Sequence, residues 1–388
     1  MLRKVLLNVV MCHKTKGISQ IGILIVSLIT LQAYADQKQL YIYNWSDYMG
    51  PETISQFEQK TGIKVTYDTF NSNEELEHFL MTQPAKYDLV VPTSNFLAKQ
   101  IDANIYQPLD KTKLPSYLKN LDPDILEMVS KDDPENTYSL PYMWISTGIG
   151  YNVDELNKRF NNAPPVDSWA LLFEPNNAEK LADCGIAWLE APSELFALAL
   201  NYLGLDPNSA TSEDYVKVSN LLSAVSPYVR YIDSTNLIDD LASGKVCVAI
   251  GWSGDIYQAM DKAAQSNNGI KIDYVIPKEG TFASFDVFAI PKTAKNVDEA
   301  YQFLNYLLEP KVIADISNYV YYANPNLAAT QFVDEAIAQD PNIYPPKNVL
   351  EHLFALTLKS PRIERAILRT WADILESRSL ANLSNEMN

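Results

Sequence analysis

A short stretch near the start of the chain brings together side chains that could hold a charged ligand. Residues 40–43 suit a buried strand, and Pro51 suits the first turn of a following helix. In open α/β sheets, ligands bind at such strand-to-helix turns. The turn here supplies two aromatic rings, a hydroxyl and a carboxylate, from Trp45, Ser46, Asp47 and Tyr48. The alternative is a tryptophan that fills the core beside a solvated aspartate.

Similar chemistry recurs at three later junctions, which supply Glu194, Trp252 with Asp255, and Ser284 with Asp286. Two of these acids stand, like Asp47, in the opening turn of an expected helix. An acid in that place stabilises the helix dipole by ~0.3–1 kcal/mol, so a single one needs no ligand. Three such acids beside tryptophan or tyrosine, at the rim where cleft ligands bind, favour a shared cation site.

An alkyl-ammonium ligand suits this set of side chains. Carboxylates attract the charged ends, and aromatic faces contact the methylenes and the cation. One carboxylate–ammonium contact is worth about 4 kcal/mol gross at ~4 Å and an effective dielectric of ~20. A ligand with two charged ends and an apolar middle therefore requires carboxylates at both ends of an aromatic slot.

Other kinds of chemistry lack their motifs. A metal ion needs ligands that converge on one point, and beyond the leader the chain has only His78 and His352, without metal-ligand spacing. Residues 148–150 are too short for a dinucleotide loop, and residues 251–254 lack the glycine spacing of a nucleophile elbow. The sequence therefore predicts no metal, no cofactor and no catalytic residue.

The first 35 residues have the pattern of a secretory signal peptide. Four basic residues, Arg3, Lys4, Lys14 and Lys16, precede an apolar run over residues 21–31. That run is shorter than the ~20 residues of a spanning helix, and a small-x-small cleavage site ends at Ala35. We expect export to the periplasm with cleavage after Ala35. Because the basic region is long, Met11 is an alternative start to Met1.

Charge and cysteine content agree with an exported soluble protein. The net charge of the 388 residues is −17, which argues against a nucleic-acid partner. Only Cys184 and Cys247 follow the leader, and in an oxidising compartment two cysteines predict one disulfide. A bridge closing a loop of about 60 residues would stabilise the fold by ~4 kcal/mol. Two buried free thiols are the alternative.

Strand and helix patterns alternate in two successive series. The first has strands over residues 63–70 and 87–91, a helix over residues 51–60 ended by Gly62, and a capping box that starts at Ser72. A long extended stretch over residues 139–151 then leads to the second series. There we expect strands over residues 186–189, 246–250, 272–276 and 285–290. Ser193 and Ser253 are the expected helix caps, the second for a helix to residue 266.

This alternation predicts an α/β fold of two lobes, each a mixed, mainly parallel sheet flanked by helices. Residues 36–145 and 286–325 form the first expected lobe, and residues 146–285 and 326–388 form the second. Strand-like crossovers join them where one flexible linker would join independent domains. Two lobes joined in this way describe a hinged clamshell that closes on a ligand.

At these residues the sequence resembles the periplasmic polyamine-binding proteins of bacterial ABC importers, most of all the putrescine-binding type. The matching motifs span nearly the whole chain after the leader and lie at residues 42–48, 88–92, 141–144, 147–152, 247–252, 286–291, 299–307 and 322–324. The resemblance implies a periplasmic-binding-protein clamshell that captures a diamine or polyamine between its lobes. It also implies delivery to an inner-membrane ABC permease complex by a monomer.

The resemblance further implies roles for single residues. Trp45 and Trp252 would form aromatic walls with Tyr48 and Tyr322 beside them. Ser46, Asp47 and Thr93 would hold one ammonium end, and Glu194, Asp255 and Asp286 would supply charge from the other side. The chain departs from the pattern at Ser284, where an aromatic residue is usual. We therefore expect a wider slot at that end and leave the preferred amine open.

A second hypothesis remains, in which the same fold is a receptor for another cationic or amino-acid-like ligand and signals through a partner. The sequence alone does not separate this receptor from a transport binding protein.

Overall fold

The computed structural model describes residues 37–345, 349, 352–357 and 359–386, and the side chains up to residue 377. The expected leader and its cleavage site after Ala35 lie outside the described residues. From Gln39 onward the chain forms one compact unit. None of the helices within these residues is long and apolar enough to serve as a membrane span.

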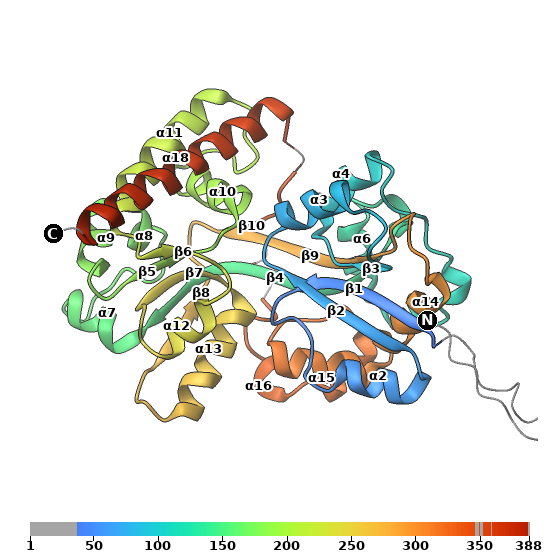
Figure 1. The fold of residues 1–388 in the computed structure, drawn as a ribbon. Helices are drawn as coiled ribbons and strands as arrows, with labels where there is room; N and C mark the ends of the chain where they lie inside the picture. Colours follow the sequence, from blue (N-terminus) through green and yellow to red (C-terminus); the bar gives the residue numbers. More distant parts are fainter. Residues whose placement is uncertain (1–36, 346–348, 350–351, 358, 387–388) are drawn as a thin grey trace, which may run out of the picture. The chain divides into compact units, whose positions relative to one another are not determined.

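Ten strands form one connected mixed sheet in the order β2-β1-β3-β9-β4-β7-β5-β6, with β10 paired to β9 and β8 paired to β4 (Figure 1). The strands are β1 (Gln39–Trp45), β2 (Lys64–Phe70), β3 (Leu89–Val90), β4 (Ser139–Asn152), β5 (Ile186–Trp188), β6 (Tyr231–Ile232), β7 (Val248–Trp252), β8 (Ile272–Val275), β9 (Thr281–Ala289) and β10 (Leu353–Phe354). Parallel pairs lie at the two ends of this order, β1 with β2 and β3, and β5 with β6 and β7, and β10 also pairs in parallel with β9. The mixed α/β fold predicted from the alternation is confirmed.

Strands β4 and β9 join the two groups of parallel strands. They pair with each other in antiparallel fashion, with Ile145 opposite Ser284. The end of β4 then pairs with β7 and β8, whereas the end of β9 pairs with β3. Both strands are buried almost throughout, as expected for strands covered on both faces. The extended stretch predicted over residues 139–151 and the strand predicted over residues 285–290 thus lie in β4 and β9, which connect the two groups.

Helices cover both faces of the sheet (Figure 1). The α-helices are α2 (Thr53–Thr61), α3 (Asn73–Thr82), α4 (Ser94–Asp102), α5 (Tyr117–Asn120), α6 (Pro123–Val129), α7 (Val153–Arg159), α8 (Ala170–Phe173), α9 (Pro175–Leu181), α10 (Pro192–Tyr202), α11 (Ser212–Val225), α12 (Leu237–Ala242), α13 (Ser253–Ser266), α14 (Val297–Leu307), α15 (Pro310–Val320), α16 (Glu335–Ala338) and α18 (Pro361–Glu386). Short 3₁₀ helices are η1 (Lys111–Lys113), η2 (Pro134–Asn136), η3 (Ser226–Tyr228) and η4 (Leu327–Phe332).

Local signals explain several element ends. The Ser72 hydroxyl accepts a hydrogen bond from the backbone N–H of Glu75, as the predicted capping box requires. Gly62 has φ 74°, the left-handed conformation that ends α2. Helix α2 begins at Thr53 and not at Pro51 as predicted. Strand β9 begins at Thr281, four residues before its predicted start, because Thr281 and its neighbours pair with β4 and β10.

Two predicted helix caps are wrong. Ala191 is the N-cap of α10 and Trp252 is the N-cap of α13, so Ser193 and Ser253 lie inside the first turns. Pro192 starts α10 two residues earlier than a cap at Ser193 would, since its missing N–H costs nothing at that position. The hydroxyl of Ser193 is therefore free for a tertiary contact, which it makes with Glu74.

The predicted disulfide between Cys184 and Cys247 is present, with Cα atoms 5.5 Å apart. It ties the segment before β5 to the residue before β7, two neighbouring strands of the sheet. Trp252 ends β7, and Glu194 lies in the first turn of α10, the helix that follows β5. The bridge therefore stabilises the part of the sheet that positions Glu194 and Trp252.

Candidate functional site

The candidate side chains are held by ends of strands and starts of helices. Trp45 is the last residue of β1, and Ser46, Asp47 and Tyr48 lie in the turn after it. The second group supplies Glu194 in the first turn of α10, Trp252 at the end of β7 and Asp255 in the first turn of α13. The others are Thr93 at the N-cap of α4, Ser284 and Asp286 on β9, and Tyr322 after α15.

A small cavity, here called the inner cavity, lies where these elements meet. Its volume is about 20 Å³, and its lining consists of Trp45, Ser46, Tyr48, Ile145, Trp252, Asp255, Asp286 and Tyr322. All of these except Ile145 were predicted from the sequence. Ile145 was missed because an isoleucine in a strand has no polar signal, and only its pairing opposite Ser284 on β9 brings it to this face.

Two tyrosines donate hydrogen bonds to two of the acids in the inner cavity. Tyr48 Oη lies 2.8 Å from Asp286 Oδ2, and Tyr322 Oη lies 3.1 Å from Asp255 Oδ1. The two rings meet edge to face with centroids 4.9 Å apart. The second oxygen of Asp286, Oδ1, is buried and has no hydrogen-bond partner among the described residues. A buried acceptor without a donor is costly, so this oxygen is available to a ligand N–H group.

The third acid, Glu194, lies beside the tryptophans. Its Oε2 accepts hydrogen bonds from Trp252 Nε1 at 3.0 Å and from Thr147 Oγ1 at 2.9 Å. The rings of Trp45 and Trp252 contact each other edge to face, with centroids 5.4 Å apart. Thr147 was missed as a site residue, because its role depends on the antiparallel register that sets it opposite Trp252.

Four predicted residues lie outside the lining of the inner cavity: Glu194, described above, and Asp47, Thr93 and Ser284. Asp47 is exposed and has φ 51°, a left-handed backbone conformation, and its charge interacts with those of Asp239 and Lys262. Thr93 is fully buried and forms an antiparallel bridge with Asp286; its Oγ1 has no partner among the described residues. Ser284 is 4% exposed and shares the face of Asp286 on β9. The wide slot expected beside Ser284 stays a prediction, because Ser284 does not line the inner cavity.

Burial raises the pKa values of all three buried acids. It raises the pKa of Glu194 to about 7 against the lowering effect of the hydrogen bonds from Trp252 and Thr147. It raises the pKa of Asp255 and of Asp286 to about 8, with Asp47 and Glu194 adding repulsion respectively. No ion pair joins these acids to a cation within the described part of the chain. A buried carboxylate is costly unless it is paired, so the site as built favours a ligand that brings positive charge.

The arrangement does not suit a metal ion. The described residues contain no group of three or more histidine, cysteine, aspartate or glutamate side chains that could hold one. Tyrosine and tryptophan occupy the space between the acids, and their rings suit methylenes and ammonium groups.

Comparisons with known proteins agree with this chemistry. The family described as bacterial extracellular solute-binding protein matches residues 52–345. The putrescine-binding periplasmic protein PotF of Escherichia coli K12 is 51% identical over 354 residues, which cover 91% of this chain and 95% of that protein. A putrescine/agmatine-binding protein of Pseudomonas aeruginosa is 42% identical over 88% of this chain and 93% of its own length.

Solved structures show the same similarity. A putative spermidine/putrescine ABC transporter protein from Listeria monocytogenes superposes with a TM-score of 0.78 at 32% identity, covering 88% of this chain and all of that one. The spermidine/putrescine substrate-binding protein PotD of Streptococcus pneumoniae has a TM-score of 0.70 at 29% identity, over 88% and 99% of the two chains.

Proposed function

Because the chain belongs to the bacterial extracellular solute-binding proteins, we propose that it captures putrescine or a related linear amine for an ABC importer. The observation that carries this proposal is the set of three buried acids without a cationic partner, in contact with aromatic rings. The relatives are proteins of ABC transporters and not enzymes, and nothing in this site requires a catalytic step.

The ligand would lie between two carboxylate ends. One ammonium group would meet Asp255 and Asp286, where Asp286 Oδ1 is free to accept its N–H bonds. The other would approach Glu194, and the methylenes would pass between Trp45 and Trp252. Because charge-assisted hydrogen bonds would form at both ends, an amine with two charges should bind more tightly than an amine with one.

Ser46, Thr93 and Asp47, which the sequence assigns to one ammonium end, differ in how near they lie to the proposed ligand. Ser46 lines the inner cavity and can reach a ligand directly. Thr93 stands next to Asp286 in the backbone and has a free hydroxyl oxygen. Asp47 would have to turn inward to touch a ligand, and in its present position it acts on the site through its charge.

Binding requires motion in this scheme. A cavity of about 20 Å³ has room for little more than one water molecule, since one water needs roughly 10–15 Å³ on this scale. We propose that residues 36–145 with 286–325 move as one lobe and residues 146–285 with 326–388 as the other. Strands β4 and β9 would carry the hinge, because both run between the two groups of strands.

We propose that the protein works as a monomer in the periplasm after cleavage behind Ala35, and that it delivers its ligand to an inner-membrane permease complex. The relatives with periplasmic names support the compartment, and the leader pattern in the sequence supports the cleavage site.

Calorimetry with the mature protein tests the function. A panel of putrescine, cadaverine, agmatine, spermidine, lysine and arginine separates linear amines from basic amino acids. We expect saturable binding of at least one linear diamine with one site per chain, and weaker or absent binding of the amino acids, whose carboxylates would meet three acids. Saturable binding of only the amino acids, or of none of the panel, would contradict the proposal.

A further inference from the structure

Gly254 occupies a position in the first turn of α13 where the backbone does not require glycine. The residue is buried and does not have the positive φ that favours glycine at turns. Alanine is the better helix former, because glycine loses more backbone freedom on folding. Local structure therefore gives no reason for a glycine here, and its surroundings must supply one.

The surroundings of Gly254 leave no room for a side chain. A Cβ atom would lie 2.2 Å from Cε2 of Tyr322 and 2.3 Å from the carbonyl oxygen of Val320. Carbon atoms in contact are normally about 3.5 Å apart, so an added methyl group would have to push these neighbours away by about 1 Å. Tyr322 is 2% exposed and donates to Asp255, and the carbonyl belongs to the backbone at the end of α15, so neither can turn aside freely.

The two sides of this contact belong to different proposed lobes. Gly254 lies in the lobe that contains α13, whereas Val320 and Tyr322 lie in the lobe that contains α15. Every other glycine in the described part of the chain has either open space at the position of a Cβ atom or its nearest neighbours within its own lobe. At Gly150, for instance, a Cβ atom would lie 2.4 Å from Cδ1 of Ile256, in the same lobe. Gly254 is thus the glycine at which the two lobes touch.

The start of α13 makes further contacts with the other lobe. The rings of Tyr257 and Tyr321 stack with centroids 5.9 Å apart, and Gln258 Nε2 donates to the carbonyl of Asp47 at 3.2 Å. Helices α13 and α15 lie side by side below the sheet in Figure 1. The first two turns of α13 therefore form a contact surface between the lobes, and Gly254 is the position in it without a side chain.

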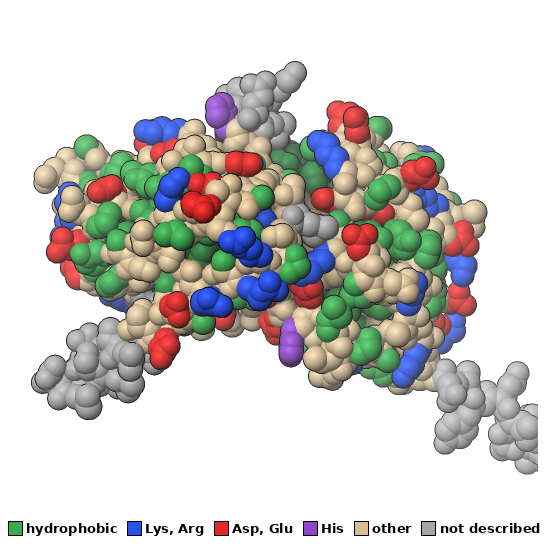
Figure 2. All heavy atoms as spheres, turned by 90° about the horizontal axis from the view of Figure 1, so that it is seen from above, with side chains coloured by type: hydrophobic (Ala, Val, Ile, Leu, Met, Phe, Trp, Pro, Cys, Tyr) green, Lys and Arg blue, Asp and Glu red, His purple; other side chains and the backbone are tan. Residues whose placement is uncertain are grey.

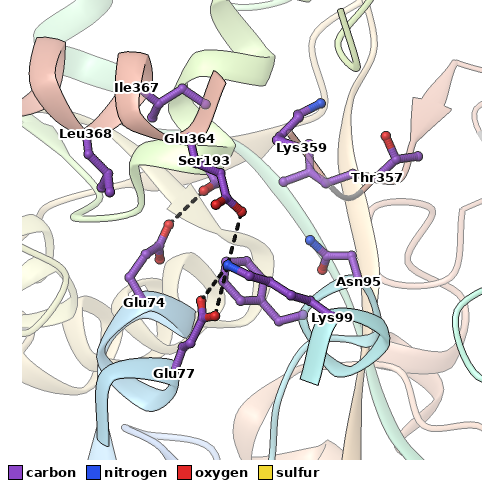
Figure 3. Close-up of a pocket in the computed structure, with 12 residues that line it drawn as sticks. Glu74, Glu77, Asn95, Lys99, Ser193, Thr357, Lys359, Glu364, Ile367 and Leu368 are labelled. Atoms are coloured by element: carbon purple, nitrogen blue, oxygen red, sulfur yellow. Dashed lines mark hydrogen bonds and ion pairs between the residues drawn. The ribbon is translucent and has the colours of Figure 1, made fainter. Parts of the chain in front are cut away.

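On the opposite face of the sheet, the lobes meet through longer polar side chains (Figure 3). Lys99 on α4 pairs with Glu364 on α18 at 3.0 Å, and Ser193 on α10 donates to Glu74 on α3 at 2.7 Å. These side chains surround a cavity of about 100 Å³, and Figure 2 shows this side of the molecule with acidic and basic side chains close together. Long side chains beside a cavity can adjust to small changes in lobe position, whereas a glycine packed against a ring and a carbonyl cannot.

The approach of the lobes at Gly254 decides how close two of the site acids come. Asp255 is the next residue in α13, and Asp286 lies on β9 in the other proposed lobe. In the proposed function, one ammonium group contacts both carboxylates. Hydrogen bonds to an ammonium group span about 2.7–3.2 Å, so holding α13 about 1 Å farther away would cost the contact with one of the two acids.

We propose that Gly254 is a positioning residue for amine binding: its lack of a side chain lets the lobes close until Asp255 and Asp286 reach the same ammonium group. Gly254 does not line the inner cavity, so it acts through the position of Asp255 and not by contact with the ligand. This inference rests on the proposed function and on the proposed lobes. A side chain at position 254 would clash only when the lobes are closed, so it would disfavour the closed state and lower the apparent affinity by the same factor.

Gly254→Ala and the bulkier Gly254→Leu test this role, with the linear amine of the calorimetry panel that the wild-type protein binds most tightly. We expect Gly254→Ala to weaken binding of this amine at least tenfold, the usual scale for atoms added to a closely packed contact, and Gly254→Leu to weaken it further. Stopped-flow tryptophan fluorescence should show faster dissociation with association within about twofold, because the amine first meets the open lobes. Saturating amine should reduce the radius of gyration less than in the wild type. The ligand-free variants should unfold in urea at or above the wild-type midpoint, since alanine and leucine favour the helix.

Gly150→Ala is the matched control, because its Cβ atom would crowd Ile256 within one lobe. It should lower the urea midpoint but keep the dissociation rate and the compaction close to wild type. If Gly254→Ala binds the amine within twofold of the wild type, the inference is wrong while the proposed function stands. If Gly254→Ala weakens binding but also lowers the ligand-free urea midpoint as much as Gly150→Ala, Gly254 serves only to pack the core, which also overturns the inference. If the wild-type protein binds no amine of the panel, the proposed function fails and the inference fails with it.

Discussion

The hydroxyl of Tyr48 lies 2.8 Å from Oδ2 of Asp286, a residue 238 positions later in the chain. A second pair, Tyr322 and Asp255, repeats the relationship at 3.1 Å. Each acid thus has a neutral donor that stabilises it without neutralising its charge. Because burial also raises the pKa values of both tyrosines well above the ordinary value, the phenols remain donors at any physiological pH. The tyrosines therefore hold the two acids in place by hydrogen bonds, but they supply no positive charge, which a cationic ligand would bring.

Asp255→Asn is expected to weaken putrescine binding by about 1.5–3 kcal/mol, the range for a hydrogen bond to a charged group. The amide keeps the shape of the side chain and its hydrogen bond with Tyr322 but removes the negative charge. Calorimetry measures the affinity, and thermal unfolding without ligand should show no loss of stability, because a buried acid has been replaced by a neutral group.

Asp47→Asn is the matched control for that experiment. Asp47 is exposed and lies outside the lining of the inner cavity, so its removal should change the affinity by much less than the Asp255 substitution. Equal losses in both variants would indicate a general effect of negative charge. If the putrescine affinity of Asp255→Asn stays within twofold of wild type, Asp255 does not bind the ligand and serves only to stabilise the start of α13.

Putrescine affinity should rise with pH between about 6 and 8. Asp255 and Asp286 have pKa values of about 8, so at pH 7 the ligand-free site holds protons that an ammonium group must displace. Binding at pH 7 should therefore release protons. Calorimetry in buffers with different ionisation enthalpies measures this release, and an enthalpy that is independent of the buffer would contradict it.

The same groups give the ligand-free protein a defined dependence of stability on pH. In the unfolded chain the carboxyls lose their protons near pH ~4, whereas in the folded protein they keep them up to about 7 to 8. Between these values the folded state binds more protons, so the free energy of unfolding falls as the pH rises from ~4 to ~8. Urea unfolding at pH 5 and pH 8 tests this, and Asp286→Asn should reduce the difference.

Ligand binding should stabilise and compact the protein. At a free putrescine concentration of about 100 times the dissociation constant, the expected gain is ~2.7 kcal/mol by mass action. Small-angle scattering should show a smaller radius of gyration with saturating putrescine, because the two proposed lobes close on the ligand. A radius that stays the same with saturating ligand would count against a hinge at β4 and β9.

Loss of the disulfide should lower the free energy of unfolding by about 2–4 kcal/mol. The double variant Cys184→Ala and Cys247→Ala tests this by urea unfolding, with the reduced wild-type protein as its control. Both should lose a similar amount, since each lacks only the cross-link. Thiol titration of the unfolded, unreduced wild-type protein should find no free thiol, and two reactive thiols would refute the bridge.

The sequence by itself determined the nature of the site and most of its members. Strand ends followed by helix starts are encoded locally, by apolar runs and by residues such as Ser72 and Gly62, so the turns that carry Trp45 and Asp255 could be located without tertiary information. An acid next to an aromatic ring at such a turn is likewise visible in the sequence. This is why nearly every residue of the inner cavity was predicted.

Only the tertiary structure decided which of these side chains meet. The sequence marks Asp47 and Asp255 alike as acids in turns, but Asp47 is exposed, whereas Asp255 is buried and accepts a hydrogen bond from Tyr322. Thr147 reaches Glu194 only through the pairing of β4 with β7. The hydrogen bond from Ser193 to Glu74 joins α10 to α3 across 119 positions, and no local pattern predicts it. Such contacts depend on strand register and helix packing, which the whole chain determines together and no short segment encodes.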